Sequence, residues 1–71
     1  MLNNYSKEIQ SQLIHITKRY HGHARRSQLR NIGYIVYPGS ISSILCDFSK
    51  EEYITINALY EEIYNNHIWN A

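Results

Sequence analysis

The first twenty residues carry the clearest apolar pattern in the chain. Apolar side chains recur there at intervals of three and four residues, as on one face of a helix: Leu2, Tyr5, Ile9, Leu13, Ile16 and Tyr20. At about 100° per residue these positions fall within a sector of about 80°, and Lys7 and Lys18 lie on the opposite side. The pattern predicts a helix over residues 4–20, begun by a polar cap among residues 3–6 and ended at Gly22.

The next segment changes from helical to β-favouring residues. A shorter helix is predicted over residues 24–31, with Leu29 and Ile32 as its apolar contacts and Gly33 as its stop. The run Tyr-Ile-Val-Tyr at 34–37 has no helical period, and its residue types favour strands. Because the residue before a proline avoids the α region, a short extended segment is predicted at 34–37.

Residues 38–48 allow two interpretations. In a helix, four apolar residues share one face: Ile41, Ile44, Leu45 and Phe48. In a strand, the segment forms a hairpin with 34–37 across Pro38-Gly39, and Ile41 and Leu45 then fall on the wrong face. Two-residue hairpins also prefer turn types other than the one that Pro-Gly forms. A helix is therefore the main prediction, and the hairpin is the alternative.

The last clear element is a helix predicted over residues 50–65. Ser49 followed by Glu52 is a capping box, in which each side chain accepts a hydrogen bond from the other residue's backbone N–H. Six apolar or aromatic side chains then mark one face of this helix: Tyr53, Ile56, Leu59, Tyr60, Ile63 and Tyr64. One continuous helix is the main prediction; a short strand at 53–56 before a helix from Asn57 is the alternative.

These elements predict a mainly α fold, a single small domain over residues 1–71 with about four helices and a short extended segment at 34–37. The alternative is an α+β fold with a hairpin at 34–48. A chain of this length buries only about 60% of its unfolded surface, so oligomerisation would help to stabilise it. The single Cys46 cannot form an internal disulfide, which favours a cytoplasmic location. Neither a signal-like start nor a long apolar stretch points to a membrane.

Charge divides the chain at Arg30. Six of the seven Lys and Arg residues lie at or before that position, and five of the six acidic residues lie after it. A basic half followed by an acidic half predicts a polyanion partner for the basic half, or a second copy that pairs head to tail. The alternative is a solvated basic face that pairs with the acidic half of the same chain or of another.

The densest basic segment spans residues 18–30. It holds five cations: Lys18, Arg19, Arg25, Arg26 and Arg30. Phosphate contacts need flexible cations with hydroxyl and amide donors nearby, which Ser27 and Gln28 supply. The segment therefore predicts nucleic-acid binding, with DNA as the main ligand and RNA compatible with the same chemistry.

Two registers of the chain resemble helix-turn-helix DNA-binding proteins. The first is similar to the generic pattern of small, apolar, capping and apolar positions, and it is carried by Ser43, Cys46, Asp47, Phe48, Ser49, Tyr53 and Ile56. Its second helix has Glu51 and Glu52 at the N-terminal end, where recognition helices approach bases and phosphates. Repulsion from phosphate makes this register the poorer one.

The second register takes residues 24–31 as the first helix and 38–48 as the recognition helix. The stretch Tyr37-Pro38-Gly39-Ser40-Ile41 resembles the opening of the recognition helix in winged-helix regulators of the PadR type. Val36-Tyr37 with Ile41, and the later run Thr55-Ile56-Asn57-Ala58, are similar to small phage Cro repressors. The resemblance implies transcription regulation by a homodimer that reads two half-sites, with base edges approached by Ser40, Ser42 and Ser43.

No catalytic residue, metal ligand set or cofactor is predicted. His21 and His23 form one close pair, whereas zinc sites usually show paired ligands at both ends of the spacing. Cys46 suits a buried apolar position. The adjacent pairs Glu51-Glu52 and Glu61-Glu62 lie on the exterior of the predicted helix, where both carboxylates stay ionised and do not form an acid–base pair.

Aromatic residues in the last third of the chain predict a protein interface. Tyr and Trp bury large areas at low entropy cost, and a core of this size has little room for so many rings. The interface is predicted at Tyr53, Tyr60, Tyr64 and Trp69, and the alternative places the tyrosines in the core of the bundle. The competing function is a small non-enzymatic inhibitor or adaptor from a phage, plasmid or other mobile element. Such a chain would bind a host protein, as toxin-antitoxin, anti-defence or host-takeover proteins do.

Overall fold

The fold is mainly α-helical. The computed structural model describes residues 1–19, 25–39 and 47–66. These residues form a short 3-10 helix η1 and three α-helices, with no strand among them: η1 Leu2–Asn4, α1 Lys7–Arg19, α2 Arg25–Val36 and α4 Lys50–Asn65. The predicted mainly α class is confirmed. The count of about four α-helices is not matched by the described residues, and most of the predicted helix at 38–48 lies outside them.

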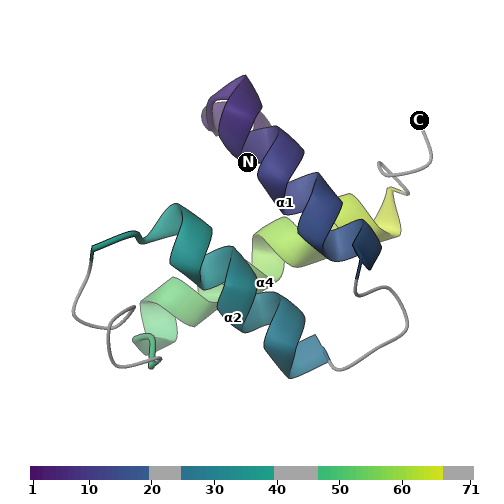
Figure 1. The fold of residues 1–71 in the computed structure, drawn as a ribbon. Coiled ribbons are helices and arrows are strands. Elements are labelled where there is room, and N and C mark those ends of the chain that lie inside the picture. Colours follow the sequence, from purple (N-terminus) through teal and green to yellow (C-terminus); the bar gives the residue numbers. More distant parts are fainter. Residues whose placement is uncertain (20–24, 40–46, 67–71) are drawn as a thin grey trace.

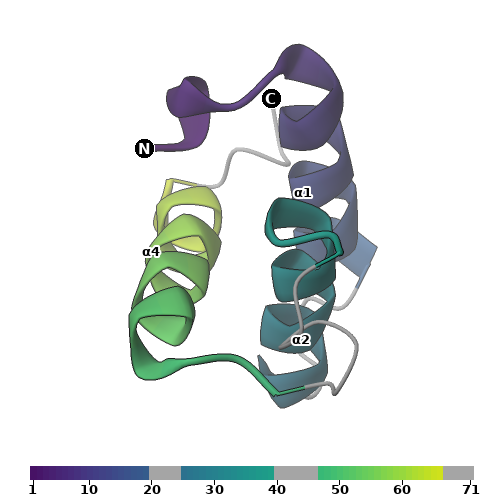
Figure 2. The same ribbon diagram turned by 90° about the vertical axis from the view of Figure 1, so that its left-hand side faces the viewer.

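The helices lie in two layers. α1 and α2 run side by side in one layer, and α4 crosses them in the other (Figures 1 and 2). α4 contacts both helices and η1 as well. α4 therefore packs against one side of the α1–α2 pair and does not cover the opposite side.

α1 begins three residues later than the sequence pattern predicts because the first residues form a separate turn. The Ile9 N–H donates to Ser6 Oγ at 3.3 Å, so Ser6 is the polar cap among the candidates at residues 3–6. Before it, Tyr5 is extended after η1. Glu62 of α4 fixes this N-terminal turn, since its carboxylate accepts the Leu2 N–H at 2.9 Å and lies 3.8 Å from the N-terminal ammonium.

The predicted extended segment at 34–37 is wrong, and so is the hairpin at 34–48 that needs it. α2 continues through Gly33 to Val36, and the Tyr37 N–H donates to the Gly33 carbonyl at 2.9 Å. A Cβ on Gly33 would lie 2.6 Å from Phe48 Cζ and 2.9 Å from Ile56 Cδ1. Gly33 is therefore a close-contact position inside the helix and not its stop, and packing against α4 overrides the local β preference.

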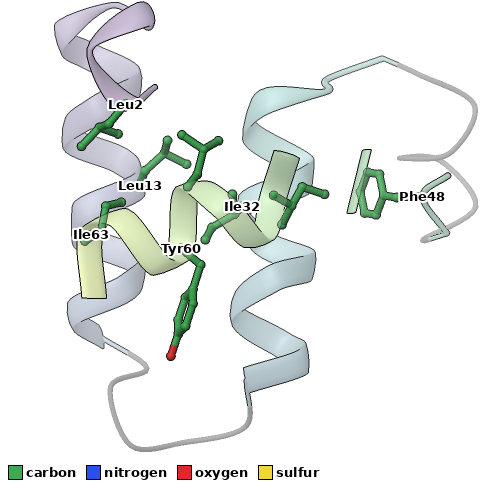
Figure 3. Packing of buried hydrophobic residues seen from close by; sticks show 8 residues of the cluster. Leu2, Leu13, Ile32, Phe48, Tyr60 and Ile63 are labelled. Carbon is green, nitrogen blue, oxygen red and sulfur yellow. The ribbon is translucent and has the colours of Figure 1, made fainter. Parts of the chain in front are cut away.

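The core forms where α4 meets the other two helices. Among the described residues the buried apolar side chains are Leu2, Leu13, Ile32, Phe48, Ile56, Leu59, Tyr60 and Ile63 (Figure 3). Phe48 extends this core into an aromatic cluster, with ring centroids 5.9 Å from Tyr34, 6.3 Å from Tyr37 and 5.6 Å from Tyr53. The cluster closes the gap between α2 and the start of α4.

The predicted helix over residues 50–65 is confirmed, and the strand alternative at 53–56 is wrong. The capping box forms as the sequence indicates: the Glu52 N–H donates to Ser49 Oγ at 3.2 Å, and the Ser49 N–H donates to Glu52 Oε1 at 2.8 Å. Ile56, Leu59 and Ile63 are fully buried. The cap and the apolar face together outweigh the β-branched residues at the start of this helix.

Candidate nucleic-acid interface

The end of α1 and the start of α2 bring the basic residues together. Lys18 and Arg19 occupy the last turn of α1, and Arg25 and Arg26 begin α2. Both helix ends lie toward the same side of the molecule, as Figure 1 shows. These four residues, with Arg30 one turn further along α2, are called the basic end below.

The described cations of the basic end reach solvent to different extents. Lys18, Arg19 and Arg26 are exposed, and Arg30 is half-buried. Lys18, Arg26 and Arg30 form no ion pair with the described part of the chain, where the ion pair found joins the N-terminus to Glu62. Arg19 already takes part in an interaction within the fold. Three cations of the basic end are therefore available to an external anion.

The first turn of α2 has the wrong charge for its own stability. α1 and α4 each start with a lysine, Lys7 and Lys50, but their first turns also contain Glu8 and Glu51 with Glu52, as the positive end of a helix dipole favours. α2 has no acidic residue in its first turn and begins with Arg25 and Arg26. A cation at that end costs about 0.3–1 kcal/mol, so helix stability does not explain this choice of residues. A bound anion would remove the cost.

Gln28 is wrongly predicted as a phosphate contact. It is only 1% exposed, and its Nε2 donates to the Thr17 carbonyl at 3.4 Å. Thr17, which the sequence pattern did not single out, is fully buried, and its hydroxyl donates to the Leu13 carbonyl at 3.0 Å. Gln28 therefore joins α2 to α1 and positions the basic end. Gln28 lies four residues before the apolar Ile32, and residues four apart share one face of a helix, so this spacing was the sequence signal for its burial.

Tyr60 is wrongly predicted as part of an exposed interface. It is 8% exposed and belongs to the core, and in Figure 3 its ring points from α4 toward the basic end. It stacks on Tyr64, with the ring centroids 5.5 Å apart. Tyr53 and Tyr64 are half-buried, and Tyr53 meets Phe48 edge to face. Tyr53 and Tyr64 pack against the core, an interface at their exposed parts stays a prediction, and Trp69 lies outside the described residues.

Several predicted residues fall where the structure gives no description. Ser40, Ser42 and Ser43, proposed to approach base edges, lie in the undescribed segment 40–46, as does Cys46. His21 and His23 lie in the undescribed segment 20–24. The prediction of a helix over 38–48 is wrong at both of its described ends, because residues 38–39 form a turn and residues 47–49 are not helical. The recognition helix of the second register thus stays a prediction.

A hollow on the outer side of α1 and α2 was not predicted from the sequence. Its volume is about 310 Å³, and it is lined by Ser11, Gln12, His15, Ile16 and Ile35. Ile35 belongs to the part of α2 that the sequence pattern placed in an extended segment. The hollow could not be found without knowing that this residue continues the helix beside α1.

The described residues contain neither a candidate metal site nor a helix that could span a membrane. Across residues 1–19, 25–39 and 47–66, His, Cys, Asp and Glu nowhere gather in a group of three or more that could bind a metal ion. Within those same residues, every helix is too short or too polar to cross a bilayer.

Comparison with known proteins gives no match to a family model, a curated protein or a solved structure. The likenesses to helix-turn-helix regulators, including the PadR and Cro types, therefore rest on the short motifs quoted above. Among the described residues, the basic end is the feature from which nucleic-acid binding is argued below.

Proposed function

We propose that this chain binds nucleic acid through the basic end, with Lys18, Arg26 and Arg30 contacting backbone phosphates. The observation that carries the proposal is the pair of arginines at the positive end of α2. The unpaired N–H groups of a helix N-terminus and its dipole favour phosphate, and the arginines add formal charge at the same place. Arg26 is exposed there, and the cost of a cation at this helix end would be recovered when an anion binds.

Phosphate contacts provide affinity but not sequence preference. We assign base contacts to Ser40, Ser42 and Ser43, as the resemblance to PadR-type regulators implies, and phosphate contacts to the basic end. In this arrangement the chain is a small DNA-binding regulator of phage, plasmid or bacterial origin that acts in the cytoplasm as a homodimer. An RNA ligand would meet the same phosphate contacts.

The test is a titration of a fluorescently labelled DNA duplex of generic sequence at low salt, followed by anisotropy. Reversing two charges of the basic end in the variant R26E/R30E is expected to weaken binding roughly hundredfold, because two attractive phosphate contacts become repulsive. The matched control is K7E/K50E, which changes two exposed lysines outside the basic end and alters the net charge equally.

The two variants distinguish a local surface from a general charge effect. Binding by K7E/K50E within a few-fold of the wild type, with the large loss confined to R26E/R30E, supports the proposal. Equal losses in both variants would show that net charge alone attracts the duplex. Absence of binding to wild-type protein at low salt would contradict the proposal outright.

One observation favours a second candidate, the inhibitor or adaptor that binds a host protein. Ile54 on α4 is 61% exposed, and the exposed Glu51 and Glu61 lie on the same side of that helix. An acidic helix with an exposed apolar residue suits docking to a basic protein surface. The duplex titration separates the two candidates, because an adaptor that docks through α4 has no reason to bind generic DNA.

A further inference from the structure

The hollow lies between α1 and α2, and no residue of α4 lines it. Ile16 and Ile35 are half-buried there, and Ser11, Gln12 and His15 are exposed. All of its lining residues belong to α1 and α2. At about 310 Å³ and open to solvent, it has room for a few side chains of a docking helix.

The α1 face beside the hollow has an ordered charge pattern. Glu8, Gln12, His15 and Arg19 follow one another at intervals of four, three and four residues, and all four are exposed. At about 100° per residue they fall within a sector of about 60°, so they form one stripe along the helix. The stripe is acidic at its first residue, neutral in the middle and basic at its last.

We propose that a second copy of this chain docks on this stripe, with the two α1 helices antiparallel. A two-fold axis at the level between Leu13 and Ile14 places Glu8 of each copy opposite Arg19 of the other. The same axis places Gln12 of each copy opposite His15 of the other. Both residues line the hollow, so the hollows of the two copies face each other. Every contact then occurs twice, as a two-fold symmetric interface requires.

Charge complementarity selects this occupant and this orientation. Parallel α1 helices would bring Glu8 against Glu8 and Arg19 against Arg19, which is repulsive. A symmetric antiparallel pair of α4 helices centred on Ile54 and Ala58 would bring Glu51 against Glu61, two carboxylates. The antiparallel α1 pair is the arrangement in which opposite charges meet.

Arg19 can serve this contact together with its interaction inside the fold. A guanidinium has five N–H donors in a planar fork. The carboxylate of Glu8 from the other copy uses only some of them, so donors remain for the interaction within the fold. A chain of this size also gains more from burying surface against a copy than a larger domain does. The inference does not depend on nucleic-acid binding: the stripe and the basic end share Arg19, but the proposed phosphate contacts come from Lys18, Arg26 and Arg30.

The test is a charge exchange between two single variants, E8R and R19E, followed by light scattering and sedimentation equilibrium without nucleic acid. The wild type is expected to be a dimer. E8R alone brings two cations together at each contact, and R19E alone brings two carboxylates together, so each is expected to dimerise roughly hundredfold more weakly. An equimolar mixture restores both opposite-charge contacts, and heterodimers are expected to form with near wild-type affinity.

Restoration in the mixture cannot arise within one chain. Glu8 and Arg19 are eleven residues apart on α1, which is about 16 Å along the helix axis. Two matched controls carry the same charge changes elsewhere: K18E, about 100° round the helix from Arg19, and E51R, in the first turn of α4. Both controls are expected to remain dimeric.

Circular dichroism establishes that each variant is folded before its mass is measured. If E8R or R19E does not fold, the neutral variants E8Q and R19Q replace them, each with an expected weakening of several-fold. A monomeric wild type, single variants as dimeric as the wild type, or a mixture that stays monomeric would each overturn the proposed interface. In those cases Glu8 and Arg19 serve their own chain, where their charges complement the dipole of α1.

Discussion

Phe48→Ala is expected to cost about 3–5 kcal/mol of unfolding free energy, as the truncation of a buried aromatic side chain usually does. The ring is 5% exposed and lies against Gly33 of α2. Tyr34, Tyr37 and Tyr53 surround it. Removing the ring leaves a cavity where α4 joins α2, and the whole stability of a small domain is often only slightly larger than this loss.

Urea unfolding followed by circular dichroism measures the effect of Phe48→Ala. The control is Phe48→Leu, which keeps most of the apolar volume and should cost distinctly less. If the alanine variant unfolded at nearly the wild-type urea concentration, Phe48 would not join the two helices, and the contact at Gly33 would have another explanation.

Gly33→Ala is expected to destabilise the protein although it improves the helix. Alanine in place of glycine inside a helix contributes about 1 kcal/mol through propensity alone. The added Cβ would lie 2.6 Å from Phe48 Cζ and 2.9 Å from Ile56 Cδ1. The aromatic neighbours of Phe48 prevent its ring from moving away freely, so overpacking of about 1–3 kcal/mol should dominate. Gly33→Val should be worse.

Thermal unfolding gives the sign of this effect directly. A domain of this size loses roughly 4–8 °C in Tm for each 1 kcal/mol. Ser27→Ala, at an exposed position of the same helix, is the control and should raise Tm slightly through propensity. An increase in Tm for Gly33→Ala would mean that α2 and α4 do not approach each other as closely as described.

Local signals in the sequence predicted α4 fully and α2 only in part. α4 starts at a capping box and has a regular apolar face, and both features depend on neighbouring residues alone. The end of α2 depends on Phe48 and Ile56, which lie far along the chain from Gly33. A glycine that admits another helix has the same local sequence signal as a glycine that ends one, so only the tertiary contact distinguishes them.

The candidate site was also predicted only in part, for the same reason. That the end of α1 and the start of α2 carry many cations is visible in the sequence as charge density, and their role as a site stays a prediction. Gln28 and Tyr60 were misplaced because an amide and a phenol can face either water or the core, and packing decides which. Thr17 and the hollow beside Ile35 were missed because both depend on which faces of α1 and α2 meet.

The contact between α1 and α2 also determines how rigid the basic end is. The buried amide of Gln28 donates to the Thr17 carbonyl, one residue before Lys18. Tyr60 of the crossing helix α4 lies in the core with its ring directed to the same end. The cations therefore extend from a backbone that the core holds in place, which would lower the entropy cost of the proposed binding to phosphate.

Salt dependence of duplex binding tests the central claim most directly. Each phosphate that a cation neutralises contributes about −0.9 to the slope of log affinity against log salt concentration. Contacts from Lys18, Arg26 and Arg30 therefore predict a slope of about −3 for the wild type and about −1 for R26E/R30E. A wild-type slope near zero, or one unchanged in the variant, would contradict phosphate binding by the basic end.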